Sequence, residues 1–249
     1  AGGWRALGLA EFHLGRDAEA RAALERAIEL DPSDAEAHTY LAGLLGMAGE
    51  HQAAGEAWLR VLAVDPSNDV ALYNAGQAFQ SAGAFARALE CFDGVVAADP
   101  SDFRALEKRV QLLQALGELP QRDAALAALM ALYASGSVPE MASRGYFVRD
   151  QFAHQDIQLL VYAFYSPGPG DPLAVALMWD DQQYQLGAFE LRASRGGEGY
   201  ELGMVVSSGT DWTYRHYAER PSYDTARADI LAVMNGEVEP VGEPVALEP

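Results

Sequence analysis

Asp31-Pro32-Ser33-Asp34 recurs further along the chain at a constant interval of 34 residues. The second copy is Asp65-Pro66-Ser67-Asn68 and the third is Asp99-Pro100-Ser101-Asp102. A period of this length is typical of a supersecondary unit that stacks on copies of itself, because a single unit cannot bury its apolar face. The repeat therefore predicts a solenoid in the first half of the chain.

Each unit contains two helical patterns joined by a turn. Apolar residues recur at intervals of three and four between the Asp-Pro stretches, as expected for amphipathic helices. Gly15, Gly49 and Gly83 stand at the same place in successive units, where one helix must end and the chain reverse. We therefore expect each unit to be a helical hairpin.

The first repeat, residues 1–34, resembles the tetratricopeptide repeat family. It carries five residues of the family's pattern: Trp4, Leu7, Gly8, Ala20 and Pro32. Glu11 departs from the pattern, which has an aromatic residue there, and Phe12 follows it directly. The small residues allow the two helices of a unit to approach closely. The resemblance implies that the first helices of the units line a concave groove, which holds an extended peptide or a partner's helix.

The sequence as a whole predicts a two-domain α+β protein. An all-α solenoid of about four hairpins occupies residues 1–135, with repeats at 1–34, 35–68, 69–102 and 103–135. The fourth repeat is degenerate, because Val110 and Arg122 replace small residues. A linker at 136–144 leads to an antiparallel β-sheet domain with a C-terminal helix at 145–236. The tail, 237–249, is expected to be extended or disordered.

The β domain is predicted from runs of β-branched and aromatic residues between clusters of turn residues. The candidate strands are residues 146–152, 157–165, 173–179, 184–193, 200–207 and 212–217. Their short connections favour antiparallel pairing, since parallel strands need long crossovers. Ala174, Ala176 and Met178 form a shallow face that is suited to receive a helix or the last repeat unit. A helix that begins at Pro221-Ser222 is expected to cover the sheet.

The charge and length of apolar runs limit the partners. The net charge of −19 is spread over both halves, with 19 acidic and 10 basic residues in 1–139 and 17 and 7 in 140–249. Nucleic acid is therefore not an expected partner, since its phosphates need a basic surface. No apolar run is long enough to span a membrane. The abundance of alanine and the single lysine suggest a bacterial source.

We expect a cytoplasmic protein, although the sequence leaves an export signal open. The first residues already fall inside a repeat unit, so we expect the N-terminus to have been trimmed. The sequence does not define the oligomeric state.

The expected groove residues follow from their positions in the repeats. They are Arg5, Tyr40, Tyr73, Asn74, Gln77, Arg104, Lys108 and Gln111. Asn74, Arg104 and Lys108 also occupy three of the five positions with which some relatives grip a C-terminal carboxylate. Thr39 and Gly43 occupy the other two and break that pattern. Two readings stay open for the basic pair: a site for an acidic ligand, or a solvated helix face neutralised by neighbouring acids.

The sequence predicts no catalytic residue, metal site or cofactor. The five histidines are scattered and lack metal-ligand spacing, and no nucleotide-binding glycine loop is present. Cys91 is expected to be an inert, buried thiol. Trp212, Tyr214 and His216 would share one face of a strand, as a plain surface, a binding patch or a catalytic group.

The expected function is non-enzymatic: an adaptor, scaffold or co-chaperone-like module that binds a peptide or protein in the groove. The alternative is an enzyme or small-ligand site in the β domain, which the repeat array would recruit to a partner.

Overall fold

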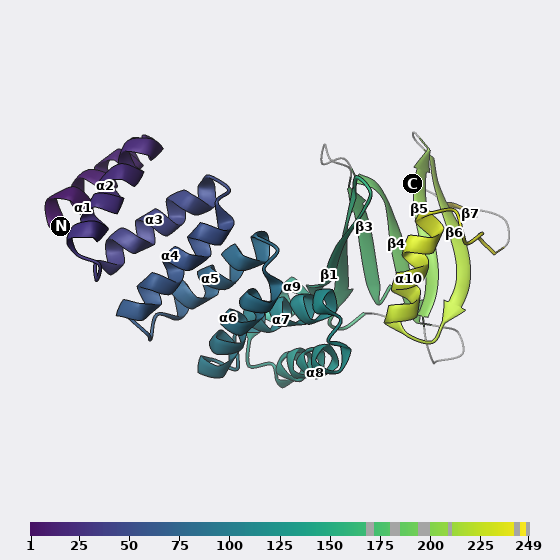
Figure 1. Cartoon of the computed structure of the whole chain (residues 1–249). Coiled ribbons are helices and arrows are strands. Elements are labelled where there is room, and N and C mark those ends of the chain that lie inside the picture. Colours follow the sequence, from purple (N-terminus) through teal and green to yellow (C-terminus); the bar gives the residue numbers. More distant parts are fainter. Residues whose placement is uncertain (168–171, 180–184, 194–199, 209–210, 242–244, 248–249) are drawn as a thin grey trace. The chain divides into compact units, whose positions relative to one another are not determined.

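The computed structural model describes residues 1–167, 172–179, 185–193, 200–208, 211–241 and 245–247. The chain divides into two compact units, residues 1–128 and residues 129–249, and each is described by itself (Figure 1). Among the helices of the described residues, none is long and apolar enough to cross a membrane.

The first unit is an array of helices, the first seven of which pack against their neighbours in sequence order. The helices are α1 (Gly2–His13), α2 (Asp17–Leu30), α3 (Ala35–Met47), α4 (His51–Val64), α5 (Asp69–Ser81), α6 (Phe85–Ala98), α7 (Phe103–Leu116) and α8 (Leu119–Ser135). The last of them begins in the first unit and ends in the second. The expected all-α solenoid of helical hairpins is confirmed.

The recurring Asp-Pro-Ser stretch sets both the turn and the start of the next helix. In the first copy, the Asp31 carboxylate accepts hydrogen bonds from the backbone N–H and the hydroxyl of Ser33. Asp34 then caps α3 by accepting a hydrogen bond of 3.0 Å from the backbone N–H of Ala37. Asn68 and Asp102 cap α5 and α7 in the same way. The repeat is therefore visible in the sequence because the same capping geometry recurs at each of the three junctions between repeats.

Glycine is required at two kinds of place in this array. Gly49, at the reversal of a hairpin, has a backbone φ of +77°, which L-residues with side chains rarely adopt. Gly8 instead allows close packing, because a Cβ added there would lie 2.7 Å from Cγ of Leu24. Gly55 is a position that the family pattern did not single out. A Cβ there would lie 2.5 Å from the ring of Phe79 in the next repeat.

The degenerate fourth repeat accommodates an arginine where the others have a small residue. Arg122 is 3% exposed, and its guanidinium donates hydrogen bonds to the side chains of Gln114 and Asp123. Val110, the other departure, is fully buried beside Ala125. The larger side chains are thus built into the packing of α7 against α8.

Cys91 lies in the core between α5 and α6. It is 5% exposed, and burial raises the pKa of its thiol to about 11. At pH 8 only about one thiol in a thousand would be ionised, and the thiolate is the reactive form. We therefore expect a colorimetric disulfide reagent at pH 8 to label native Cys91 at least tenfold more slowly than the urea-unfolded chain. Equal rates would contradict the burial of this thiol.

The second unit is built on a seven-stranded antiparallel sheet in which every strand pairs with the next one in sequence. The strands are β1 (Tyr146–His154), β2 (Ile157–Phe164), β3 (Ala174–Trp179), β4 (Gln185–Ala193), β5 (Tyr200–Ser208), β6 (Asp211–Arg220) and β7 (Val245–Leu247). A helix, α10 (Tyr223–Met234), follows β6 and contacts β5 and β6. The expected antiparallel sheet with a C-terminal helix is confirmed.

Two segments have secondary structure that the sequence did not predict. The expected linker contains a short helix, α9 (Pro139–Arg144), whose Met141 is fully buried. The tail, expected to be extended or disordered, contributes the extended strand β7, which pairs with β6. Both segments are short, and their apolar residues are too few to show a periodicity.

The shallow side of β3 is the buried side of the sheet. Ala174, Ala176 and Met178 are at most 4% exposed, whereas Val175 and Leu177 on the opposite side are partly exposed. Successive side chains of a strand point to opposite faces of the sheet, so the register of β3 determines which of these five residues are buried.

A buried carboxylate joins the first strand to the last helix. Asp150 follows a β-bulge in β1 and is 1% exposed. It pairs with Arg227 and accepts a hydrogen bond of 3.1 Å from the Tyr223 hydroxyl, both on α10. Burial raises the pKa of Tyr223 well above its usual value, and the Asp150 charge adds to this effect. The hydroxyl therefore stays protonated and can donate to the carboxylate.

Candidate functional site

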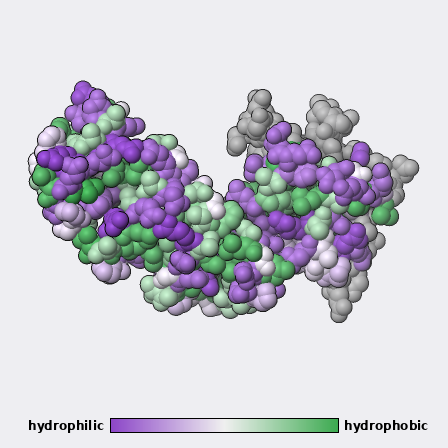
Figure 2. Space-filling view, in the orientation of Figure 1, coloured by the Kyte–Doolittle hydropathy of each residue, from purple (hydrophilic) through white to green (hydrophobic). Residues whose placement is uncertain are grey.

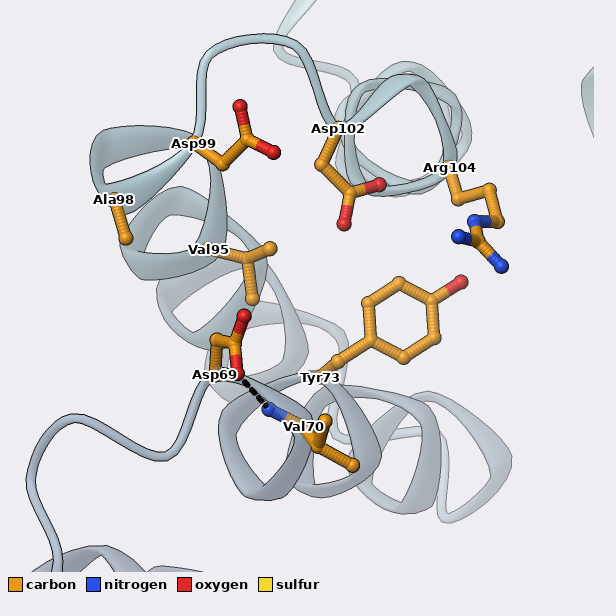
Figure 3. Close-up of a pocket in the computed structure, with 8 residues that line it drawn as sticks. All are labelled: Asp69, Val70, Tyr73, Val95, Ala98, Asp99, Asp102 and Arg104. Carbon is orange, nitrogen blue, oxygen red and sulfur yellow. Dashed lines mark hydrogen bonds between the residues drawn. The ribbon is translucent and has the colours of Figure 1, made fainter. Parts of the chain in front are cut away.

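The first unit has a pocket where the start of α5, the end of α6 and the start of α7 meet. Its volume is about 250 Å³. Its lining is mixed in character and consists of Asp69, Val70, Tyr73, Val95, Ala98, Asp99, Asp102 and Arg104 (Figure 3). Residues of two successive repeats, the third and the fourth, therefore form the walls of the pocket.

Helix termini place the three aspartates around this pocket. Asp99 ends α6, and its Oδ1 accepts hydrogen bonds from the hydroxyl and the backbone N–H of Ser101. Asp102 caps α7. Asp69 is the first residue of α5, and its Oδ1 accepts from the backbone N–H of Val70. The same local rules that stop and start the helices therefore concentrate negative charge there.

The protonation states of the pocket follow from these contacts. The hydroxyl and backbone N–H of Ser101 hold the pKa of Asp99 below its usual value, so it is charged at neutral pH. Burial raises the pKa of Tyr73, and this outweighs the opposing hydrogen bond with Gln77. Tyr73 therefore keeps its hydroxyl proton, and Figure 3 shows that hydroxyl beside the Arg104 guanidinium.

Of the expected groove residues, the structure brings Tyr73 and Arg104 together in the pocket. Gln77 is exposed one turn after Tyr73, and Asn74 is partly buried next to it. Lys108 is partly buried, whereas Gln111 is only 7% exposed. The accessible part of the expected surface is thus centred on α5 and the first turn of α7.

The two residues expected at the N-terminal end of the groove are engaged within the array. Arg5 donates hydrogen bonds to both carboxylate oxygens of Asp34, at 3.1 and 3.2 Å, and also pairs with Glu36. Tyr40 packs edge-on against Phe12 and His13. Arg5 therefore links the first hairpin to the second.

The second expected patch lies only partly within the described residues. The register pairs Trp212, Tyr214 and His216 with alternate residues of β5, but the side chains of Trp212 and His216 are outside the described part of the chain. The Tyr214 hydroxyl occupies the space above Gly203, since a Cβ there would lie 1.9 Å from it. Burial raises the pKa of Tyr214.

The side of the sheet opposite to its buried side is partly apolar. A shallow hollow of about 300 Å³ is lined by Tyr146, Tyr162, Phe164, Val175 and Leu177.

In the first unit, hydrophilic residues cover much of the visible face, and hydrophobic residues show between them (Figure 2).

The sequence did not lead us to assign the three pocket aspartates or Val70 to the groove. Asp99 and Asp102 belong to the repeated Asp-Pro-Ser stretch, which served only to define the period, and Asp69 directly follows its second copy. Once turn residues are recognised as helix caps, their carboxylates must lie at the junction of successive repeats.

Comparison with known proteins identifies a family for the start of the chain. Residues 1–44 match the family model described as tetratricopeptide repeat. The match spans α1, α2 and most of α3. It ends within the second hairpin, and the 34-residue spacing of the Asp-Pro-Ser stretch continues beyond it.

Several solved structures are similar to part of the chain. A crystal structure of MamA is 24% identical, with a TM-score of 0.47, and the match covers 57% of this chain and 79% of that one. A MamA structure from Desulfovibrio magneticus RS-1 is 18% identical, with a TM-score of 0.45 and coverage of 54% and 76%. One titled MamA AMB-1 is also 18% identical, with a TM-score of 0.49 and coverage of 56% and 76%. No curated protein matches the chain.

Proposed function

We propose that the tetratricopeptide array is a non-enzymatic adaptor or scaffold module that holds an extended segment of another protein. Tetratricopeptide proteins bind protein partners, and the match of residues 1–44 to this family supports a role in protein interaction. The proposed binding surface is formed by the first helices of the hairpins. Its residues are the expected groove set, Arg5, Tyr40, Tyr73, Asn74, Gln77, Arg104, Lys108 and Gln111, together with Val70.

The pocket between the third and fourth repeats is the observation that best supports this surface. Tyr73 and Arg104, both groove positions, line it, and Val70 at its edge is 63% exposed. An exposed apolar side chain beside a half-buried aromatic ring offers a contact that can be desolvated on binding. The charged residues around it supply the polar rim of such a site.

The test is binding of peptides selected from a random phage-displayed library on the immobilised chain. Their affinities are then measured by fluorescence anisotropy with Val70→Gln. We expect this variant to bind about tenfold more weakly, since it replaces an apolar contact by an amide that must be desolvated on binding. Val70 lies in the first turn of α5, and glutamine is a good helix former.

Phe85→Gln is the matched control. Phe85 is also an exposed apolar residue, at 38%, in the first turn of a helix. It lies at the end of α6 opposite to the pocket, about 20 Å along the helix axis. Unchanged affinity with Val70→Gln, or equal losses with both variants, would place the binding surface elsewhere.

A further inference from the structure

We propose that the pocket between the third and fourth repeats receives a basic side chain, arginine or lysine, of the bound segment. This inference rests on the proposed function and specifies its ligand. The pocket has three carboxylates, from Asp69, Asp99 and Asp102, and one guanidinium, from Arg104. Its charge therefore complements a cation.

The carboxylates keep acceptor capacity for such a ligand. The hydrogen bonds that fix them to the backbone end on the Oδ1 atom in each case. A carboxylate offers about four acceptor sites in all. Guanidinium and ammonium groups form charge-assisted hydrogen bonds with carboxylates, which are stronger than neutral ones.

The apolar wall suits the stem of a long basic side chain. Val70, Val95 and Ala98 line the same pocket as the aspartates. In Figure 3, Val95 lies between Asp69 below and Asp99 above, so aliphatic and charged surfaces alternate. Arginine and lysine bury their methylene groups along apolar surface and keep the charged head near polar groups. The Tyr73 ring adds a face on which a cation can be held.

Size and geometry disfavour other occupants. The volume of about 250 Å³ is below the roughly 300–1,000 Å³ of small-molecule sites, so a single side chain fits better than a cofactor. Within the described residues, no group of three or more His, Cys, Asp or Glu side chains is arranged to hold a metal ion. An acidic side chain would meet three negative charges and one positive charge.

The direct test uses two small probes that differ in charge but hardly in shape. Acetyl-arginine methylamide is compared with its citrulline analogue by chemical-shift perturbation in ¹⁵N-labelled protein at 150 mM salt, where distant charges are screened. We expect the arginine probe to shift the amide resonances of Asp69, Val70, Asp102 and Arg104, and to bind at least threefold more tightly than the citrulline probe.

Two variants of the pocket should move the affinity in opposite directions. Asp99→Asn/Asp102→Asn is expected to weaken binding of the arginine probe about tenfold, because each exposed ion pair contributes modestly. The cap of α7 should survive, since Asn68 caps α5 in the same way. Arg104→Gln is expected to tighten binding about twofold by removing a like charge.

A control separates the pocket from the general acidity of the chain. Glu19→Gln/Glu90→Gln makes the same change in net charge at exposed positions on α2 and α6, and it should leave the affinity unchanged. Equal affinity of the two probes, or an equal loss with both double variants, would overturn the basic-side-chain proposal.

These outcomes are distinct from failure of the proposed function. If the selected peptides bind through Val70 but their affinity does not depend on a basic residue, only the proposed basic ligand is refuted. If the arginine probe binds at the pocket but no peptide can be selected, the cation site is supported and only the peptide groove is refuted.

Discussion

Replacing Asp150 by alanine is expected to lower the free energy of unfolding of the second unit by about 3 kcal/mol. The carboxylate is 1% exposed and joins β1 to α10 through Arg227 and Tyr223. Removing one partner of a buried pair leaves the other charge without compensation, and that penalty exceeds the net value of the intact pair. Arg227 keeps a side-chain exposure of 24%, which places the expected loss at the lower end of the usual range.

The measurement must be specific to the second unit, because a two-unit chain need not unfold in one step. Native-state hydrogen exchange of peptides from β1 and α10 provides it. Asp150→Asn is the isosteric control and should lose less, since the amide oxygen can still accept from the Tyr223 hydroxyl. Combining Asp150→Ala with Arg227→Met should recover part of the loss. Strictly additive losses would show that the pair is not coupled.

Replacing Gly55 by alanine is expected to destabilise the first unit by up to about 2 kcal/mol, although alanine is the better helix former. Alanine favours an isolated helix by about 1 kcal/mol over glycine. The new methyl group, however, would lie 2.5–2.7 Å from three ring atoms of Phe79, which is fully buried. Overpacking of this kind costs about 1–3 kcal/mol, and a ring held from both sides cannot move away cheaply. Arg87 lies over the same ring, 4.0 Å from its centroid.

Gly43→Ala is the matched substitution with the opposite expected sign. Gly43 is inside α3, and no atom lies within 4 Å of an added Cβ. The substitution should therefore stabilise the first unit by up to about 1 kcal/mol. Urea unfolding followed by the helical circular dichroism signal compares the two variants. If Gly55→Ala also stabilised the protein, the contact between α4 and Phe79 would have to relax at little cost.

The sequence was sufficient for the elements whose rules are local. Gly15, Gly49 and Gly83 predict helix ends because only glycine tolerates the left-handed conformation there without strain. The alternation of Ala174, Ala176 and Met178 with bulkier residues identifies the buried face of β3 from period two alone. In each case one short window contains the physical cause.

Contacts between distant segments were not predictable in this way. Asp150 reads as an ordinary strand residue, and its burial depends on Tyr223, which is 73 residues away in sequence. The close approach of Gly55 to Phe79 depends on the packing of successive repeats. Likewise, positions in the repeats predict Tyr73 and Arg104 for the groove, but not the aspartates that surround them. A periodic pattern shows which side of a helix or strand is apolar. It does not show which side chains of other elements pack against that side.

Because each of β1 to β5 pairs with the strand that follows it, each of these hairpins can form as soon as its second strand has left the ribosome. Short loops carry a small closure entropy, and such nearest-neighbour topologies have low contact order. The helices of the array also pack in order of synthesis. The attachment of α10 to Asp150 and the pairing of β7 with β6 across α10 are exceptions, since each joins segments that are distant in sequence. Growth of this protein from its N-terminus therefore leaves these two long-range contacts to form last.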